Sequence, residues 1–358
     1  CHFGGRRLLD RNRTAALADP TLPKKRHHTC RTRSGHHPCG RQIRFERQCN
    51  SSDHLDRSIT VEWLWGILSL GAVSAIWSIG IERHLYRVRE TQIADALPAG
   101  TSEIRVLHIS DIHLAPWQKR KKRWVGQLSA LNPDLVINTG DNMSHRAAVD
   151  DALAMLEPLQ RFPGVFVNGS NDYHAPTFRN PFTYLFAPSK VENGAPLDTA
   201  KFVETLAERG WIDLNNRSGE LVIRGLKVGF LGLDDPHDRL DDVNSLAQQT
   251  AQTPYCDLKI GVVHAPYLRI IEALTLSDAS LIFAGHTHGG QVCLPGKGAL
   301  VTNCDLPTRH AKGLSAWNFS GKLSILNVCA GLGTSIFAPV RFFCLPEVRL
   351  VTLLPRAN

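Results

Sequence analysis

Two histidines separated by one residue, His286 and His288, lie within the glycine-flanked stretch Gly285–Gln291. The stretch directly follows an apolar run at 280–284, a pattern typical of a short buried strand. The flanking glycines allow a tight turn in which both imidazoles can face one place. Neutral imidazole is the commonest metal-binding side chain in proteins. The stretch therefore predicts part of a metal site.

Other residues that can bind metals follow apolar runs in the same way. In an open α/β sheet, ligands bind beyond the carboxyl ends of the strands, so these residues are expected to share one cleft. Each short motif by itself is a common turn, but their joint occurrence at successive strand ends favours a metal site. In chain order they are Asp111, His113, Asp141, Asn171, Asp172, Asp235, His237, His264, His286 and His288.

Strands and helices alternate in the segment that carries the first of these residues. Apolar runs at 104–109, 134–138 and 164–168 are separated by helical stretches at about 119–131 and 147–159. This βαβαβ order predicts an α/β fold with parallel strands and right-handed crossovers.

The rest of the chain continues this alternation less regularly. Residues 179–196 are expected to form a loop or lid, and a helix is predicted at 198–209. The remaining predicted strands, of which the first two form a hairpin, are 221–223, 228–233, 259–263, 280–284, 323–328 and 348–354.

The excess of positive charge is confined to one end of the chain. The net charge is +8, and residues 1–58 contain 13 Lys or Arg and 5 Asp or Glu, whereas residues 59–358 contain 28 of each. Because the larger part is neutral, a nucleic-acid partner is not expected. Residues 1–58 lack apolar periodicity, and we interpret them as a disordered segment or a spurious extension ahead of the true start.

An uncharged stretch follows at Trp63–Ile81, with 19 residues. As a helix it would span roughly 28 Å, close to the thickness of the hydrocarbon core of a bilayer. Residues 59–82 are therefore predicted to be a single-pass membrane anchor, with the apolar core of a signal peptide as the alternative. The side of the membrane that the globular domain faces stays open. Residues 83–102 are expected to be a linker, and residues 103–358 the globular domain.

The first predicted helix of that domain opens with a basic run, Lys119–Arg123. Such a run is usually a solvated helix face. Beside a membrane anchor, it also suits contact with anionic lipid headgroups.

Taken together, the motifs resemble those of the calcineurin-like metallophosphoesterases over about residues 103–355. The pattern of that family is D-x-H, G-D, G-N-H-D/E, a single H, and G-H-x-H. The sequence Gly-His-Thr-His-Gly-Gly-Gln looks like the membrane-associated bacterial branch. The resemblance implies an α/β fold, a four-layer α/β/β/α sandwich of the metallo-dependent phosphatase type. The matching positions are Asp111/His113, Gly140/Asp141, the variant Gly169–Asp172, His264 and Gly285–His288.

The resemblance also implies two divalent metal ions. Mixed nitrogen and oxygen ligation suits Mn, Fe or Zn. A water between two such ions becomes a hydroxide near neutral pH and attacks phosphorus in line. Carried over motif by motif, Asp111, His113 and His288 bind the first ion, Asp141 bridges both, and His264, His286 and an amide oxygen from the third motif bind the second.

The third motif departs from the family pattern, because G-N-H-D becomes Gly169–Asp172, with the sequence Gly-Ser-Asn-Asp. In strict alignment, Ser170 replaces the ligand Asn, and Asn171 replaces the His that protonates the leaving group. With a shift of one residue, Asn171 supplies the ligand oxygen instead. We favour the shift, since a neutral hydroxyl is a poorer replacement for an amide oxygen.

In both alignments the usual general acid is missing. Its help is typically worth about 10²–10⁴-fold in rate, so the enzyme is expected to need a good leaving group or a replacement acid. The candidate replacements are His174, Tyr173, His145 and His237.

These features predict a membrane-anchored dimetal phosphoesterase. The expected substrate is a phosphodiester or pyrophosphate, either a phosphorylated small molecule or a nucleotide-linked or lipid-linked component of the envelope. The alternatives are a phosphomonoesterase, and a metal-binding protein of low catalytic activity because of the altered third motif.

Overall fold

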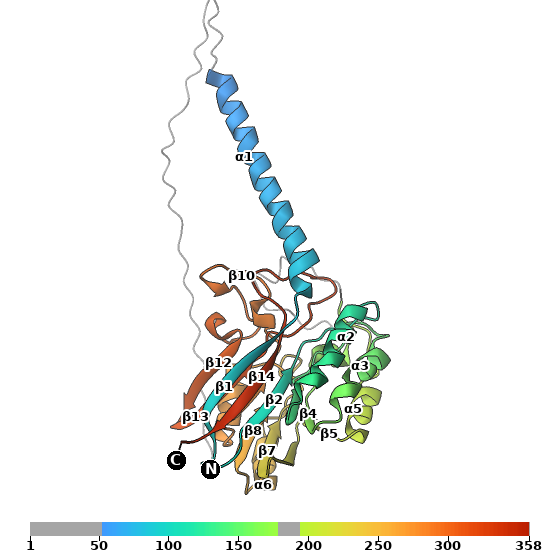
Figure 1. Cartoon of the computed structure of the whole chain (residues 1–358), viewed down its shortest axis with the longest axis vertical. Helices are drawn as coiled ribbons and strands as arrows, with labels where there is room; N and C mark the ends of the chain where they lie inside the picture. The colour runs from blue at the N-terminus through green and yellow to red at the C-terminus, as the bar shows by residue number, and fades with distance from the viewer. Residues whose placement is uncertain (1–51, 178–193, 358) are drawn as a thin grey trace, which may run out of the picture. The chain divides into compact units, whose positions relative to one another are not determined.

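The computed structural model describes residues 52–177 and 194–357 (Figure 1). The described domain belongs to the compact unit Ser58–Asn358. The predicted disordered extension at 1–58 lies outside the described residues up to residue 51. The predicted loop or lid at 179–196 lies outside them up to residue 193.

The first of two six-stranded sheets has the order β1-β14-β2-β3-β4-β5. Strands β2, β3, β4 and β5 are parallel, which confirms the predicted βαβαβ arrangement, and β14 is antiparallel to β2. The six strands are β1 (Arg87–Leu97), β14 (Glu347–Pro355), β2 (Ile104–Ile109), β3 (Leu135–Asn138), β4 (Gly164–Phe166) and β5 (Trp211–Asp213).

The second sheet has the order β12-β13-β9-β8-β7-β6. Its middle strands are parallel, and an antiparallel hairpin closes each edge. The predicted hairpin is confirmed as β6 and β7, whereas β12 was not predicted. The strands are β6 (Ser218–Ile223), β7 (Leu226–Gly232), β8 (Leu258–Val262), β9 (Leu281–Ala284), β12 (Gly313–Phe319) and β13 (Lys322–Val328), and a small ladder joins β10 (Cys293–Leu294) to β11 (Gly298–Ala299).

The two sheets pack face to face between two layers of helices. Apolar side chains of both sheets, including Val106, Ile137 and Phe283, form one buried cluster between them. Burying each large apolar side chain stabilises the fold by about 1.5–3 kcal/mol. The outer face of the first sheet is covered by α2 (Lys119–Gln127), α3 (Val149–Leu156) and α5 (Thr199–Glu208), and that of the second by α6 (Ser245–Gln252) and α7 (Leu268–Leu276). The predicted α/β/β/α sandwich is confirmed.

The prediction of a linker at 83–102 is wrong over Arg87–Leu97. These residues form β1, which pairs in parallel with β14 at the edge of the first sheet. The strand is polar because it lies at an edge, and of its residues only Ile93 and Leu97 are buried. Its partner lies about 260 residues away in sequence, for example Arg87 opposite Glu347, so no local pattern indicated the pairing. The domain therefore starts ahead of residue 103.

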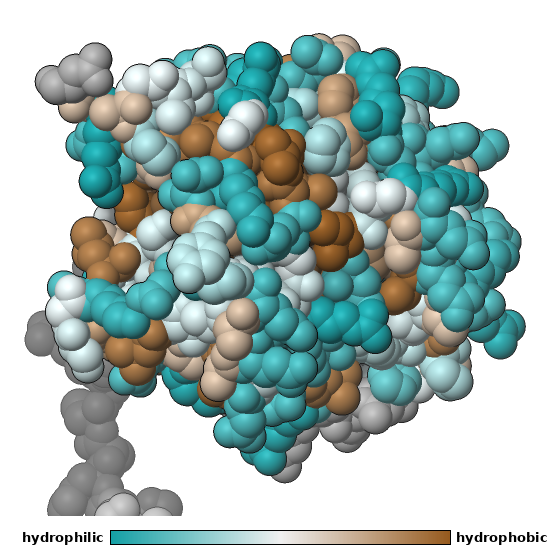
Figure 2. Space-filling view, turned by 90° about the horizontal axis from the view of Figure 1, so that it is seen from below, coloured by the Kyte–Doolittle hydropathy of each residue, from teal (hydrophilic) through white to brown (hydrophobic). Residues whose placement is uncertain are grey.

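The predicted anchor at 59–82 lies within a longer helical segment. It comprises α1 (Ser52–Ala75), a π-helical turn at Ile76–Ile81 and a 3₁₀ turn at Glu82–His84. Val61–His84 spans 24 residues, and its most apolar window is only 6% buried, so it is long and apolar enough to cross a membrane and is not a core helix. By contrast, the domain face in Figure 2 is mainly hydrophilic, with separate apolar patches.

Candidate metal centre

The predicted ligands follow five strands, three in the first sheet and two in the second, and Asn171 follows β4. Asp111 follows β2 and Asp141 follows β3 in the first sheet, while His264 follows β8 in the second. The backbone N–H of His286, after β9, donates to the Asp111 carboxylate at 3.0 and 3.1 Å. This contact joins the two sheets at the ends of their strands, so one cluster of side chains forms from loops far apart in sequence.

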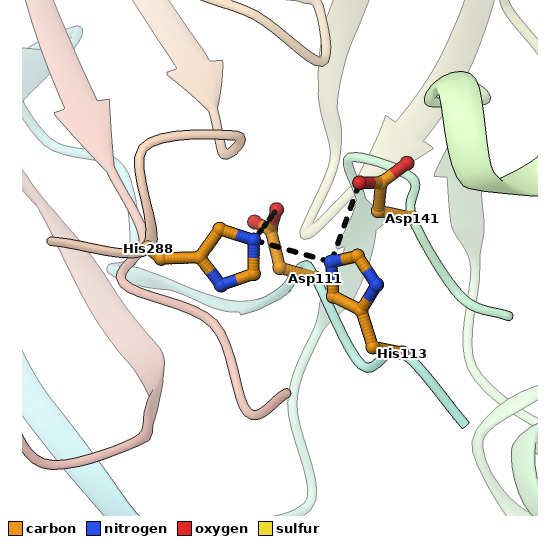
Figure 3. A group of neighbouring side chains, drawn as sticks. All are labelled: Asp111, His113, Asp141 and His288. Atoms are coloured by element: carbon orange, nitrogen blue, oxygen red, sulfur yellow. Dashed lines mark hydrogen bonds and ion pairs between the residues drawn. The ribbon is translucent and has the colours of Figure 1, made fainter. Parts of the chain in front are cut away.

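Four of the predicted ligands form a compact cluster: Asp111, His113, Asp141 and His288 (Figure 3). One donor atom from each lies within 4.8 Å of the others. His113 Nε2 is 3.3 Å from Asp141 Oδ2, and His288 Nε2 is 3.5 Å from Asp111 Oδ1. The two Nε2 atoms are 3.1 Å apart. The side chains turn toward one another, as they must to share a cation.

The two imidazoles of this cluster present nitrogen lone pairs. Burial lowers the pKa of His113 and of His288 to about 4, so both rings are neutral at pH 7. His288 Nδ1 donates to the carbonyl oxygen of Gly333 at 3.2 Å, which leaves its Nε2 unprotonated. His113 Nδ1 contacts Ser144 Oγ at 2.9 Å. Lone pairs and carboxylates that face one another repel unless a cation lies between them, so the donor set fits a divalent metal.

Within this cluster, Asp141 is the residue that also faces His264. Burial raises the pKa of Asp141, but His264 and His113 outweigh it and hold that pKa well below its usual range. Burial lowers the pKa of His264, and the Asp141 carboxylate outweighs this and raises it well above its ordinary value. His264 Nδ1 donates to Thr139 O at 2.6 Å, and its Nε2 lies 3.5 Å from Asp141 Oδ2. The Asp141 carboxylate therefore favours a positive charge at His264, either a proton on the ring or a metal ion beside it.

Five of the seven predicted ligands have a strained backbone conformation. Asp111, His113, Asp141, His286 and His288 all have φ between 47° and 67°, in the left-handed region. Each such residue costs on the order of 1 kcal/mol, and this strain persists only where surrounding contacts impose it. Here the backbone N–H of Asp111 donates to Gly140 O, and that of His113 donates to Asp141 O, both at 2.9 Å. Clustered strain of this kind is typical of functional sites.

Glycines allow the loops to approach this closely. A Cβ at Gly285 would overlap Ser110 Oγ and the Asp111 carboxylate. A Cβ at Gly169 would overlap the Asp141 carboxylate and the His264 ring. Close packing therefore requires glycine at these two positions, whatever the backbone conformation.

A second group of rings lies beside the four-residue cluster. The ring of His286 is 5.2 Å from that of His264 and 4.6 Å from that of His237. Burial lowers the pKa of His286 well below its ordinary value, and its Nε2 lies 3.3 Å from Asn303 O. The structure thus brings His264 and His286 next to each other, although neither belongs to the compact group of four.

The model of the calcineurin-like phosphoesterase family matches residues 104–290, which is more than half of the chain. The chain belongs to this family. The matched region contains Asp111, His113, Asp141, His264 and His288, the residues whose geometry is described above. The family typically binds divalent metals, and the cluster of Asp and His side chains agrees with that property.

Individual relatives are more distant. A transmembrane protein with metallophosphoesterase domain from Danio rerio is 27% identical over 232 residues, covering 63% of this chain and 49% of its own. An uncharacterized metallophosphoesterase of Bacillus subtilis is 24% identical over 309 residues, covering 84% of this chain and 98% of its own. The chain thus spans about half the length of the zebrafish relative. A dimetal phosphatase structure from Danio rerio shares 11% identity and covers 64% of this chain and 88% of its own, with a TM-score of 0.36.

In the altered third motif of this calcineurin-like phosphoesterase, Asn171 contacts Asp141. The backbone N–H of Asn171 donates to Asp141 Oδ1, and its side-chain Nδ2 donates to Asp141 Oδ2, both at 2.8 Å. Ser170 Oγ is 3.5 Å from Asn171 Nδ2. Among the side chains of this motif in the described chain, the Asn171 amide therefore contacts Asp141 directly, through its nitrogen.

The candidate acids differ in their positions. His237 lies against His286, and its Nδ1 is 3.1 Å from Tyr267 Oη. His174 forms a backbone bridge with Pro196, and its buried Nδ1 has no hydrogen-bond partner within the described residues. Tyr173 donates to Asp234 at 2.7 Å, and His145 packs on Trp117. Of the four, His237 is the one that the described contacts place beside a predicted ligand.

Three further residues support the site, and two of them, Lys121 and Arg341, were not predicted as part of it. Asp172 accepts from the backbone of Asn142 and of Gly169, and burial, followed by the charge of Asp141, raises its pKa to about 7. Lys121 is buried, and its Nζ donates to Ile112 O at 2.6 Å. Arg341 is fully buried and donates to the carbonyl oxygens around His288. Lys121 stands in a basic run that is typical of an exposed helix face, and Arg341 bonds to carbonyl oxygens of other segments, so only the fold reveals these contacts.

Proposed function

We propose that the chain is a metal-dependent phosphoesterase that hydrolyses a phosphodiester or pyrophosphate bond, in a nucleotide-linked or lipid-linked envelope substrate at a membrane surface. The observation that carries the hydrolytic part is the compact group of Asp111, His113, Asp141 and His288, with Asp141 also facing His264. An oxygen-rich and nitrogen-rich group of this kind, in a phosphoesterase family, is suited to holding cations beside a phosphate.

Two ions, Mn, Fe or Zn, would be held by these side chains. We assign Asp111, His113 and His288 to one ion, His264, His286 and Asn171 to the other, and Asp141 to both. When bound, such ions supply Lewis-acid polarisation of the phosphoryl oxygens and lower the pKa of bound water. Ser144, Thr139 and Gly333 fix the ring orientations by hydrogen bonds to the outer imidazole nitrogens, and this keeps the inner nitrogens directed into the site.

Proton delivery to the leaving group is assigned to His237. Its ring packs at a tilt against the ring of His286, and its Nδ1 contact with Tyr267 holds the ring in place. His174 is the second candidate, because its buried Nδ1 lacks a partner among the described residues. Asn171 would orient substrate or ligate metal through its amide, but it has no titratable proton.

The membrane part of the proposal rests on the segment Val61–His84, which is long and apolar enough to be a single-pass anchor. Relatives from Danio rerio and Bos taurus are named transmembrane proteins with a metallophosphoesterase domain. An anchored site meets substrates concentrated in or on the bilayer, which favours a lipid-linked phosphate over a freely diffusing one. We also place the chain in the membrane-associated branch with the Gly-His-Thr-His-Gly-Gly-Gln motif.

The altered third motif favours one alternative, a metal-binding protein of low catalytic activity. Assays of the full chain in detergent, with Mn²⁺, distinguish a phosphoesterase from a metal-binding protein. The substrates are bis-p-nitrophenyl phosphate and p-nitrophenyl phosphate. We expect metal-dependent turnover that is faster on the diester and lost in Asp141→Asn, but kept in the surface control Asp278→Asn. Binding of Mn²⁺ without turnover on either ester would favour the alternative, and faster turnover of the monoester would favour a phosphomonoesterase. A panel of lipid-linked diphosphates then identifies the substrate class.

A further inference from the structure

The end of the candidate membrane span is fastened to the catalytic domain by a buried carboxylate. Glu82 is 2% exposed and accepts hydrogen bonds from the backbone N–H of Cys344 at 2.6 Å and of Phe343 at 3.1 Å. It also accepts from Trp77 Nε1 at 2.8 Å. The backbone N–H of Arg341 donates to Ser78 O at 3.1 Å. The helix is thus hydrogen-bonded to the domain and not joined to it by a free linker, so the domain surface around Glu82 is held at the end of the span.

Helix α2 packs against the same end. The ring of Trp124 in α2 lies 5.4 Å from the ring of Tyr86, whose hydroxyl is 3.5 Å from His84 Nδ1. Burial raises the pKa of Tyr86, while the positive charges of Arg120 and Arg83 act in the opposite direction, which places both guanidinium groups in its surroundings. Arg120, in the basic run of α2, therefore lies near the last residues of the span.

The surface at this place combines exposed apolar and cationic side chains. Trp117 is 61% exposed, Phe343 57% and Leu85 40%. Arg120 is exposed, and Arg83 is half-buried. None of the ion pairs formed among the described residues includes Arg83 or Arg120, nor the neighbouring basic residues Lys119 and Arg123. Tryptophan and unpaired cations are the side chains suited to the boundary between a bilayer and water.

We propose that this membrane-proximal surface, formed by Arg83, Leu85, Trp117, Arg120 and Phe343, binds the anionic lipid headgroups of the bilayer that Val61–His84 crosses. The partner follows from charge complementarity and from continuity with the candidate span. The inference rests on the membrane anchorage in the proposed function. It adds that the catalytic domain lies against the bilayer in one orientation, with the loop 341–344, which supports His288, next to the headgroups.

The test uses the full chain in nanodiscs of phosphatidylcholine, with or without phosphatidylglycerol, whose acyl chains are brominated near the headgroup. Bromine quenches nearby tryptophans, and the difference between the unaltered chain and Trp117→Phe isolates Trp117. We expect Trp117 to be quenched, and more strongly with phosphatidylglycerol. Arg120→Glu should reduce the ratio of headgroup-bound to unbound surface, read from the quenching of Trp117, by at least about fivefold. Each charge near an anionic surface has an effect of this size.

Arg356→Glu is the matched control. The backbone N–H of Arg356 donates to Leu97 O, at the opposite end of β1 from Arg87, so the same charge change lies about 35 Å from the proposed surface. It should leave the quenching unchanged. Quenching that is equal in both lipid mixtures and insensitive to Arg120→Glu overturns the headgroup proposal. The Trp117→Phe variant keeps Trp63, Trp65 and Trp77 in the span. If bromine quenches none of its tryptophans, the anchor itself is overturned. The failure of the anchor is thus distinguished from the failure of the headgroup proposal.

Discussion

Arg341 and His288 share one hydrogen-bond acceptor, the carbonyl oxygen of Gly333. Arg341 donates to it through Nη2 at 2.8 Å and Nε at 3.3 Å, and His288 Nδ1 donates to it at 3.2 Å. Arg341 Nη2 also donates to Ala330 O at 2.8 Å, and Nη1 lies 3.4 Å from His288 O. One buried guanidinium thus positions both the backbone and the ring of a predicted metal ligand.

Arg341→Lys should therefore weaken metal binding. A lysine has one donor group and cannot reproduce the planar set of contacts, so the His288 ring loses its fixed orientation. Loss of such supporting contacts typically reduces metal affinity by about 10–100-fold. Titration of the metal-free full chain with Mn²⁺, followed by calorimetry, measures the change. Arg349→Lys is the control, because Arg349 is also buried but bonds to Glu347 and Thr91 in the sheet. Equal losses in both variants would mean that Arg341 has a general structural role.

Divalent metal should stabilise the fold. A ligand that binds only the native state at a concentration of 100 times its Kd adds about 2.7 kcal/mol to the free energy of unfolding. Thermal unfolding with Mn²⁺ and with a chelator should show this difference as a higher Tm. In Asp141→Asn the increase should be largely lost, because the amide cannot replace the charge between His113 and His264. An undiminished Tm increase in that variant contradicts the assignment of Asp141 as a bridging ligand.

His237→Gln should slow the hydrolysis of diesters with poor leaving groups. Removing a general acid costs about 10²–10⁴-fold in kcat, and the loss should shrink for nitrophenol esters, which need little protonation. His174→Gln is the comparison, since His174 contacts the backbone of Ser170 and Pro196. The dependence of kcat on leaving-group pKa is the measurement. The assignment of the acid would be reversed if kcat depended more steeply on leaving-group pKa in His174→Gln and its dependence were unchanged in His237→Gln.

Gly285→Ala should destabilise the protein and disturb the site together. The added methyl group overlaps Ser110 Oγ and the Asp111 carboxylate, and overpacking of this kind costs about 1–3 kcal/mol. Gly126→Ala is the matched control, because its new methyl group meets only Pro158 Cγ, at 3.8 Å, in helix α2. Helix propensity should make that variant more stable by about 0.5–1 kcal/mol. Chemical denaturation of both variants, with Mn²⁺ titration, provides the comparison. Unchanged stability in Gly285→Ala would show that the two loops separate easily.

A chain that starts at residue 90 should be less stable than one that starts at residue 82. The shorter chain lacks Arg87, which pairs with Glu347 in register and by a 3.0 Å ion pair. It also lacks Glu82, so the N–H groups of Phe343 and Cys344 lose their acceptor. A buried donor left without a partner costs about 1–3 kcal/mol. Thermal unfolding of both chains in the same detergent measures the difference. Identical midpoints would mean that residues 82–89 act as a linker after all.

The sequence was sufficient for the central strands and for the chemistry at their ends. Apolar runs such as 104–109 and 134–138 are strong local signals, and the residues that follow them must lie at the carboxyl edge of a parallel sheet. The placement of Asp111, Asp141 and His264 followed from this rule. Strand β1 and helix α7 were missed. The first is polar at a sheet edge, and the second is a short amphipathic helix between two strong strand signals.

What the sequence by itself determined is the type of site: carboxylates and imidazoles after successive strands, and one apolar stretch of membrane-spanning length. Their local patterns are encoded within a few residues. Only the tertiary structure decided which groups meet. It grouped His113 with His288 and turned the Asn171 amide to Asp141. It also buried Glu82 against Cys344, and Arg341 against the backbone of His288. These contacts join residues up to about 260 positions apart, and such pairings depend on the packing of two sheets and not on any local pattern.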